Sequence, residues 1–505
     1  MVPVFIDMAK SVLCQAVKDG KVTEVKRLLE LGGSVNSYYD GPLFHIAAKR
    51  GHVDMINTMT VLKAYINIPN TDGATPMYIA GQNGHIDALR ALAGLGANVN
   101  TPRTDGTTPV FIAALNGYIA AIKILSDLGA DLNSSDHNGV TPMFYAALKG
   151  RIDVIKALSD LGADVNSSKG VGPLFVAALN GHVDTIKVLS GLGADVNTPD
   201  KNGATPVFIA AQNGYVDVIK TLAALGADVN TPDKDGVTPL LFAALQGHIG
   251  AIKALSALGA NVNTPRNDGV TPVFVAALNG HVDMINALNS LGADINTPKW
   301  DGATPVYIAA YSGHTDAIKA LSIAGADVNT PTQGGATPVL VAAHEGHVDA
   351  IKVLAGLGAD ISSPNTDGAT PVLIAAENGR MDAIKALAGL GANVKTPRTD
   401  GLTPLFIAAM NDHGSSVKAL YKLGADMGST SSYERGGELS ILGAACIEKI
   451  LKKMHCECEC CGCSTKKLLV CGGCKKVRYC SRECQKKDRK QHRDECKIHI
   501  LSRNS

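Results

Sequence analysis

The feature that most restricts the fold of this chain is a repeat of about 33 residues that runs through most of its length. A proline marks each unit, and nine of the eleven intervals between successive prolines are 33 residues long. These prolines stand at positions 42, 76, 109, 142, 173, 206, 239, 272, 305, 338, 371 and 404. A fixed period in this range indicates stacked supersecondary units that bury their apolar faces on their neighbours. The sequence therefore predicts a repeat stack without a single globular core.

One unit, residues 235–263, shows the local chemistry of the repeat. It reads DGVTPLLFAALQGHIGAIKALSALGANVN. Thr238 can cap a helix that begins at Pro239, because the missing N–H of proline costs nothing at a first helical position. A second helix carries one apolar stripe at Ile249, Ile252, Leu255 and Leu258, and Gly259 can end it in a left-handed cap. Each unit is therefore predicted to be a helix–turn–helix preceded by a turn.

These units resemble ankyrin repeats, through the recurring patterns D-G-x-T-P, A-A-x-x-G-H and L-G-A-D-V-N. The resemblance implies a mainly α fold: an ankyrin-repeat solenoid of helix-turn-helix repeats with β-hairpin-like fingers. We expect an N-terminal capping repeat at 1–41 and an array of about 12 repeats at 42–426. We also expect the histidine of the family's T-P-L-H pattern to be absent from every full repeat. Phenylalanine, tyrosine or leucine takes its place, which predicts apolar packing there without a change of fold.

The C-terminal part holds a cluster of metal-ligand residue types. Ten of the twelve cysteines lie within residues 456–496. Pairs of soft ligands two to four residues apart surround a tetrahedral zinc, and their clustering argues against disulfides. The clearest pairs are Cys471-x2-Cys474, Cys480-x3-Cys484 and His492-x3-Cys496. The sequence therefore predicts a zinc domain at 456–496.

The stretch CGGCKKVRYCSRECQKKDRKQHRDEC resembles the MYND-type zinc finger. The resemblance implies two structural Zn²⁺ ions in interleaved sites, each with four protein ligands. One site combines a first cysteine pair with Cys480 and Cys484, and the other is formed by Cys471, Cys474, His492 and Cys496. The first pair is Cys458 with Cys461, which the following Gly462 favours, or instead the overlapping Cys460 with Cys463. Arg489 stands where the family usually has tryptophan. The family's usual peptide-binding surface would lose an apolar anchor and gain a charge at this position.

Residues 427–455 connect the array to the zinc domain, and 497–505 form a C-terminal tail. The segment from Glu438 to Met454 is predicted to be helical, either as a half-repeat that caps the array or as a free linker helix. Charge is uneven along the chain, because residues 446–505 carry 16 Lys and Arg against 7 Asp and Glu. The N-terminus lacks the pattern of a signal peptide, and no apolar run is long enough to span a membrane. We therefore expect an intracellular protein of the cytoplasm or nucleus that is not secreted.

No catalytic motif is present, since the P-loop, G-x-S-x-G and H-E-x-x-H patterns are all missing. The recurring histidines share one repeat position and are interpreted as turn-stabilising residues. Tyr118, Arg151, Tyr215 and Arg380 replace them elsewhere, which a catalytic histidine would not allow. The sequence therefore predicts that the protein is not an enzyme.

Function is expected where the repeats differ from one another. By the resemblance, a binding groove is lined by the residue before Asp-Gly and by the two residues before the inter-helix glycine. Trp300, the only tryptophan, occupies the first position, and Tyr311, His344 and Glu345 break the pattern at the second. Aromatic residues anchor many interfaces, so these four are predicted to bind a partner, against the alternative of drift in a duplicated array. Leucines at 115, 148, 179, 245 and 278 either form an apolar groove stripe or pack between repeats.

The predicted function is a non-catalytic scaffold or adaptor. The ankyrin groove binds one protein partner, and the MYND finger recruits another, a proline-containing peptide by resemblance. The alternative is a nucleic-acid-associated transcriptional regulator that uses the basic zinc-finger region. Its basic residues are scattered around the ligands and Tyr479 is the main aromatic residue there, which favours the protein-binding hypothesis. The protein is expected to be a monomer without membrane contact.

Overall fold

The computed structural model describes residues 11–31, 34, 42–166 and 170–425, together with the backbone of two short strands, β1 (Leu469–Val470) and β2 (Arg478–Tyr479). The described array is a series of short helix pairs, as the mainly α prediction requires. The chain divides into two compact units, Met1–Asn267 and Asp268–Ser505, and each is described by itself.

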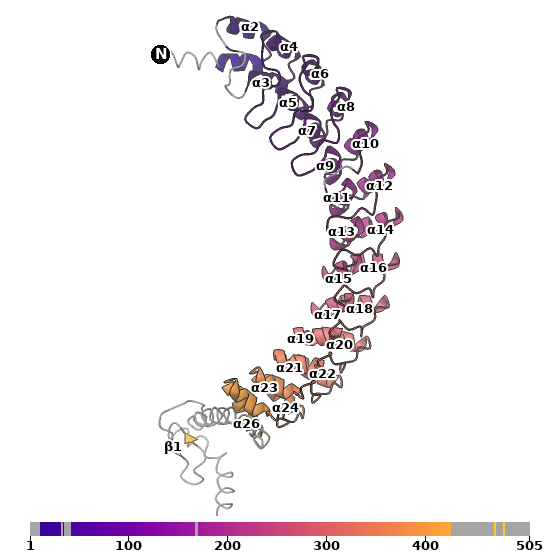
Figure 1. Ribbon diagram of the computed structural model, residues 1–505, viewed down its shortest axis with the longest axis vertical. Helices are drawn as coiled ribbons and strands as arrows, with labels where there is room; N and C mark the ends of the chain where they lie inside the picture. Colours follow the sequence, from indigo (N-terminus) through magenta and orange to yellow (C-terminus); the bar gives the residue numbers. More distant parts are fainter. Residues whose placement is uncertain are drawn as a thin grey trace, which may run out of the picture. The chain divides into compact units, whose positions relative to one another are not determined.

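In the first unit, seven inner helices begin at or just after the repeated proline. They are α3 (Leu43–Arg50), α5 (Pro76–Gln82), α7 (Pro109–Asn116), α9 (Pro142–Leu148), α11 (Pro173–Leu179), α13 (Pro206–Gln212) and α15 (Pro239–Leu245). The outer helices form a second row beside them (Figure 1). They are α2 (Val22–Glu30), α4 (Val53–Val61), α6 (Ile86–Gly94), α8 (Ile119–Asp127), α10 (Ile152–Asp160), α12 (Val183–Gly191), α14 (Val216–Ala224) and α16 (Ile249–Ala257).

The second unit repeats this arrangement. Its inner helices are α17 (Pro272–Leu278), α19 (Pro305–Ser312), α21 (Pro338–Glu345), α23 (Pro371–Glu377) and α25 (Pro404–Met410). Its outer helices are α18 (Val282–Ser290), α20 (Thr315–Ile323), α22 (Val348–Gly356), α24 (Met381–Gly389) and α26 (Gly414–Lys422). The loop before each inner helix is called its finger. The surface formed by fingers and the exposed sides of inner helices is called the inner face.

The predicted helix starts and stops are confirmed. Thr238 occupies the N-cap of α15, where its Oγ1 accepts a hydrogen bond from the Leu241 N–H at 3.2 Å, and Pro239 follows it. The outer helix α16 ends before Gly259, which adopts a left-handed φ of 90°. A threonine caps most other inner helices in the same way, while glycine occupies that position at Gly172.

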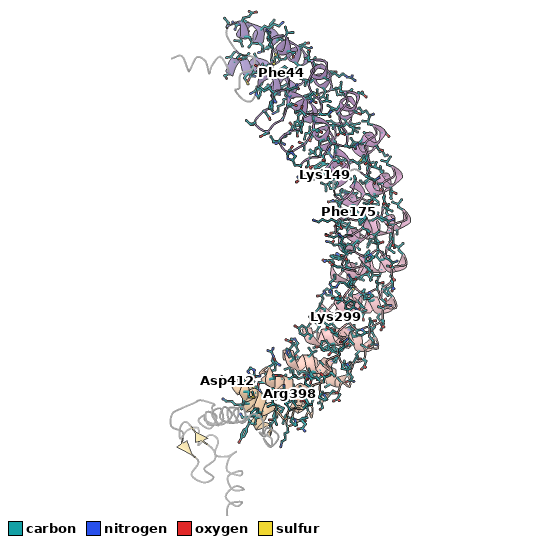
Figure 2. All side chains as sticks on the ribbon, in the orientation of Figure 1. Phe44, Lys149, Phe175, Lys299, Arg398 and Asp412 are labelled. Carbon is teal, nitrogen blue, oxygen red and sulfur yellow. The ribbon has the colours of Figure 1, made fainter. Side chains whose placement is uncertain are left out.

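Paired alanines on the inner helices and branched residues on the outer helices form the core. Ala113 is completely buried, as are Ile122 and Leu125 on the following outer helix. Because alanine side chains are small, successive inner helices pack closely along the stack. Phenylalanines at the T-P-L-H histidine position are buried where Phe111, Phe208 and Phe274 occupy it, which confirms the expected apolar packing. Side chains fill the space between the rows of helices (Figure 2).

One expectation about the first full repeat is wrong. Pro42 is the N-cap residue of α3 and not its first helical residue, so this repeat is shifted by one position. His45 therefore occupies the T-P-L-H histidine position, which was expected to hold no histidine. Its buried Nε2 lies 2.7 Å from the carbonyl oxygen of Ala74 in the next repeat. The interval of 34 residues between Pro42 and Pro76, against the usual 33, indicates this shift. The proline alone does not define the register of the repeat.

The recurring histidines join neighbouring repeats, as predicted. His248 Nε2 lies 3.1 Å from the carbonyl oxygen of Gln212, and its ring covers Gly214. A Cβ at Gly214 would come within 2.8 Å of that ring, so the glycine is required by close approach as well as by its φ of 71°. Arg380 makes the equivalent bond through Nε to the His344 carbonyl oxygen at 3.0 Å. The position is therefore structural even where histidine is replaced.

The two hypotheses for residues 427–455 concern a segment outside the described residues. Within the described parts of the chain, no helix is both long and apolar enough to cross a membrane.

Candidate partner-binding surface and zinc finger

The finger before α19 presents Trp300 to solvent, as the sequence predicts. Its side chain is 70 % exposed, and its ring edge approaches Gly269 of the preceding finger. Asp301 fixes the finger, because its Oδ1 accepts the Ala303 N–H at 3.0 Å and its Oδ2 accepts from Lys299 Nζ at 3.2 Å. Lys299 lies at the inner side of the second unit (Figure 2). Trp300 is thus held at the tip of an ordered turn.

Trp300 differs from the residues at the same position of other fingers. The hydroxyls of Thr104 and Thr399 each donate to a carbonyl oxygen of the preceding finger at 2.6 Å, and Thr366 does so at 3.0 Å. Gln333 Nε2 donates to the Trp300 carbonyl oxygen at 2.6 Å. Among the described residues, none accepts a hydrogen bond from the Trp300 indole. A side-chain hydrogen bond to the preceding finger therefore does not explain why tryptophan occupies this position.

Tyr311, His344 and Glu345 lie on the adjacent inner helices of the same unit. Tyr311 on α19 is 47 % exposed, and its carbonyl oxygen lies 3.0 Å from Nε2 of His347. His344 and Glu345 end α21, with His344 Nδ1 2.7 Å from Glu345 Oε1. A carboxylate only accepts hydrogen bonds, so His344 Nδ1 carries the proton of this bond. The structure therefore orders this acid–imidazole pair at the C-terminal end of α21.

The structure adds Tyr307, which sequence reasoning treated only as a substitute for the T-P-L-H histidine. Tyr307 lies one helical turn before Tyr311 on α19 and is half-buried. Burial, followed by the nearby Asp301, Tyr311 and Glu345, raises the pKa of Tyr307 above its usual value. Tyr307 and Tyr311 are one turn apart on α19, Asp301 lies in the finger before this helix, and Glu345 ends the adjacent α21. The available signal was a tyrosine at a position where half of the twelve repeats carry phenylalanine.

The leucines of the inner face divide between the two hypotheses. Leu115 is partly buried and packs against the cluster of Ala74, Tyr78 and Ile112, which span neighbouring repeats. Leu179 and Leu278 are each 39 % exposed. The leucine position therefore serves packing at one end of the series and adds apolar surface elsewhere.

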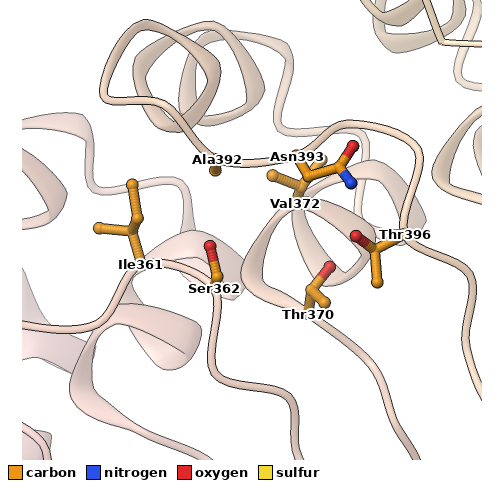
Figure 3. Close-up of a pocket in the computed structure, with 7 residues that line it drawn as sticks. All are labelled: Ile361, Ser362, Thr370, Val372, Ala392, Asn393 and Thr396. Carbon is orange, nitrogen blue, oxygen red and sulfur yellow. The ribbon is translucent and has the colours of Figure 1, made fainter.

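A small cavity lies between two fingers of the second unit (Figure 3). Its volume is about 10 Å³, and its lining residues are Ile361, Ser362, Thr370, Val372, Ala392, Asn393 and Thr396. A space of this size holds no more than a single water molecule. In the described ranges, no three His, Cys, Asp or Glu side chains come together in a metal-binding group. The described array therefore offers surface contacts for a partner and no enclosed ligand site at this cavity.

The predicted zinc ligands lie outside the described residues, but two strands locate their chain neighbours. β1 and β2 pair antiparallel, with Leu469 opposite Tyr479 and Val470 opposite Arg478. Cys471 follows directly on β1, and Cys480 follows directly on β2. Because the strands are antiparallel, the chain leaves them at opposite ends of the ladder.

The donor set fits zinc. Residues 458–496 hold nine cysteines and His492, and eight of these ten groups form four closely spaced pairs, which is the ligand type and spacing of closed tetrahedral sites. Two such sites would use all eight groups and leave no open position for a substrate. This donor chemistry is that of structural metal.

Comparison with family models identifies both parts of the chain. The model described as ankyrin repeats (3 copies) matches residues 13–103, 95–169, 166–233, 225–299, 292–365 and 339–431. The MYND finger model matches residues 458–496. The protein therefore belongs to the ankyrin-repeat proteins and carries a C-terminal MYND-type zinc finger, a module that binds zinc. No curated protein sequence matched the chain.

Both modules are known for protein–protein interaction, which supports an adaptor role. Ankyrin repeats and MYND fingers are typically non-catalytic, and they are typical of intracellular proteins.

Proposed function

We propose that this protein is a two-site adaptor, in which the inner face of the second unit binds one protein and the MYND finger binds another. The observation that carries the first site is the exposure of Trp300 at an ordered finger tip. Tyr311 and the His344–Glu345 pair lie on the same face. Exposed aromatic groups beside polar ones are the residues that dominate binding energy in interfaces.

The second site is the zinc finger, which takes two structural Zn²⁺. One ion is held by Cys458, Cys461, Cys480 and Cys484, and the other by Cys471, Cys474, His492 and Cys496. The match to the MYND model begins at residue 458, which supports the Cys458–Cys461 pair over Cys460–Cys463. The metal supplies folding energy, and the finger's ordered surface recruits a proline-containing peptide.

A capture experiment with the full chain tests both sites together. The wild-type chain is compared with Trp300→Ala/Tyr311→Ala and with Cys471→Ser/Cys474→Ser by quantitative mass spectrometry of bound proteins. We expect each variant to lose a different set of partners. Loss of the same set in both variants, or of none, would contradict the two-site model.

A nucleic-acid function is the second candidate, because residues 446–505 are basic. Binding of DNA or RNA that weakens steeply with salt and survives Trp300→Ala/Tyr311→Ala would favour it over the adaptor.

A further inference from the structure

Tyr78 shows how this fold satisfies a tyrosine at the T-P-L-H histidine position. Arg103 of the next finger lies close enough to Tyr78 for the phenol to help raise the pKa of the guanidinium. The Tyr78 hydroxyl lies 3.1 Å from Thr107 Oγ1, which in turn donates to Asp105 Oδ1 at 2.6 Å. Arg103 also pairs with Asp105 at 3.1 Å and lies 3.9 Å from Asp72. Tyr78 is 3 % exposed within this network.

The Tyr78 phenol and the two carboxylates favour the charged guanidinium at this place. Burial opposes the charge of Arg103, but the nearby Tyr78, Asp105 and Asp72 outweigh it and raise its pKa. Tyr78 and Asp72 of one repeat therefore lie beside Arg103 of the next repeat.

Tyr307 occupies the same repeat position without this arginine. Asp301 stands in its repeat where Asp72 stands in the first network. The next finger, however, carries short residues where the first network has its arginine, aspartate and threonine: Thr332, Gly334 and Ala336 replace Arg103, Asp105 and Thr107. None of these three can reach the phenol oxygen with a cationic group.

The consequence is visible in the exposure and bonding of Tyr307. It is half-buried, whereas Tyr78 is buried, and no described residue makes a hydrogen bond to its hydroxyl. Asp301, Tyr311 and Glu345 lie close enough to Tyr307 to affect its ionisation. We call the place beside Tyr307, Asp301 and Thr332 the Tyr307 notch.

We propose that the Tyr307 notch receives the guanidinium group of an arginine presented by a partner protein, in the place that Arg103 fills beside Tyr78. The proposal rests on the proposed binding role of the inner face and names the chemistry of the partner. The phenol oxygen of Tyr307 accepts one N–H of the guanidinium, and Asp301 provides the carboxylate. Trp300 and Tyr311 supply aromatic surface nearby, on which a planar guanidinium stacks better than an ammonium group.

Lys299 does not close the notch to a cation. Lys299 donates to Oδ2 of Asp301 and the Ala303 N–H donates to Oδ1, but a carboxylate offers about four lone-pair sites, so Asp301 can accept a third donor. Glu345, whose Oε1 lies 2.7 Å from His344 Nδ1, adds a further carboxylate. The notch therefore combines hydrogen-bond acceptors with negative charge, which suits arginine and disfavours an acidic side chain.

Trp300 makes the test direct, because it is the only tryptophan and all indole fluorescence of the full chain comes from it. The full chain is screened on an array of immobilised nonapeptides of varied sequence with a central arginine, and on the same set with citrulline, which has a similar shape without the charge. The tightest peptide is then titrated in solution against Trp300 emission. We expect the citrulline form to bind at least about tenfold more weakly, since a hydrogen bond to a charged group is lost.

Two variants test whether the arginine of the peptide binds at the Tyr307 notch. Tyr307→Phe should weaken binding of the arginine peptide about tenfold. This variant should fold, because Phe208 and Phe274 are buried at the equivalent position of other repeats. Thr332→Arg/Gly334→Asp rebuilds the arginine and the aspartate found beside Tyr78 and should block the peptide with the chain's own guanidinium. The control Asp72→Asn, in the first unit, should leave binding unchanged.

The outcomes separate this inference from the proposed function. Equal affinity for arginine and citrulline peptides, wild-type affinity in Tyr307→Phe, or no arginine-dependent response at all would overturn the notch. If a labelled citrulline peptide binds as tightly and Trp300→Ala still weakens it, the inner face remains a binding surface and only the arginine preference fails. If Trp300→Ala leaves binding of every peptide unchanged, the proposed surface itself fails.

Discussion

Asn100 bonds across to the repeat that contains Asp131: its side-chain Oδ1 accepts the Asp131 N–H at 2.8 Å, and its Nδ2 donates to the Gly129 carbonyl oxygen at 3.0 Å. The same acceptor bond recurs in each unit. Its other donors are the backbone N–H groups of Asn98, Asp164, Asp195, Asp228 and Asn261 in the first unit, and of Asp327 and Asp360 in the second. A single side chain thus satisfies two backbone groups of its neighbour, and this explains why asparagine ends most copies of the L-G-A-D-V-N pattern.

The asparagine bonds predict a measurable contribution to stability. Asn100→Ala removes both bonds and should lower the free energy of unfolding by about 1–2 kcal/mol. Asn100→Asp keeps the acceptor and should cost less. Urea unfolding of the full chain measures both, with exposed Lys123→Ala as the control for a surface change. Equal midpoints for Asn100→Ala and Lys123→Ala would show that the bonds contribute little.

His45 predicts a pH dependence of stability. Burial lowers the pKa of His45 despite its hydrogen bond to the Ala74 carbonyl oxygen, and its buried Nδ1 has no partner among the described residues. In the unfolded chain a histidine titrates near about 6.5. Below that pH the unfolded state binds a proton on His45 that the folded state does not bind. The contribution of neutral His45 to the free energy of unfolding is therefore complete above the unfolded pKa and is lost as pH falls toward the folded pKa.

The test compares wild type with His45→Phe, because Phe111 shows that the position accepts phenylalanine. Urea midpoints are measured at neutral pH and at a pH below the unfolded pKa. The drop at low pH should be smaller in His45→Phe, since the remaining histidines titrate equally in both proteins. An equal drop would mean that His45 is not responsible.

The sequence predicts the elements that depend on local chemistry. Thr238 and Pro239 define a helix start within two residues, and the structure places it there. The shift at His45 was missed because the proline period fixes register only when the proline keeps its helical position. The exposure of Tyr307 was missed for a different reason. The next repeat carries Thr332 and Ala336 where Arg103 and Thr107 stand for Tyr78, and the local pattern around a residue does not show what the next repeat supplies.

The zinc content is the next prediction. Structural zinc contributes roughly 10–16 kcal/mol of apparent binding energy in small domains, so the full chain should retain its metal through purification. Metal analysis should give two zinc ions per chain in the wild type and one in Cys471→Ser/Cys474→Ser. Cys14→Ala should keep both ions, because Cys14 is buried in the first helical segment. A single ion in the wild type would contradict the interleaved sites.

The first ligand pair can be assigned by a matched pair of double variants. Cys458→Ser/Cys461→Ser should lose one zinc ion, whereas Cys460→Ser/Cys463→Ser should keep two. Both variants remove two thiols from the same short stretch, so a general effect on the finger would appear in both. The reverse result would assign Cys460 and Cys463 as ligands, and two ions in both variants would mean that the pairs substitute for each other.

Trp300 gives the last prediction, which separates binding from folding. Repeat proteins are stabilised by contacts between neighbouring units, and a side chain that is 70 % exposed adds little to them. Truncation of an interface aromatic typically costs about 2 kcal/mol of binding, roughly thirtyfold in affinity. Trp300→Ala should therefore leave thermal unfolding nearly unchanged and weaken the partner of the inner face at least about tenfold.

The control for Trp300→Ala is Lys234→Ala. Lys234 holds the same finger position in the first unit, is exposed, and makes no side-chain hydrogen bond among the described residues. Thr104 is unsuitable, because its hydroxyl donates to the Asp72 carbonyl oxygen and its removal would disturb the finger. Lys234→Ala should change neither unfolding nor binding. If Trp300→Ala lowers the unfolding temperature and spares binding, Trp300 is a packing residue and the inner face of the second unit loses its main support as a binding surface.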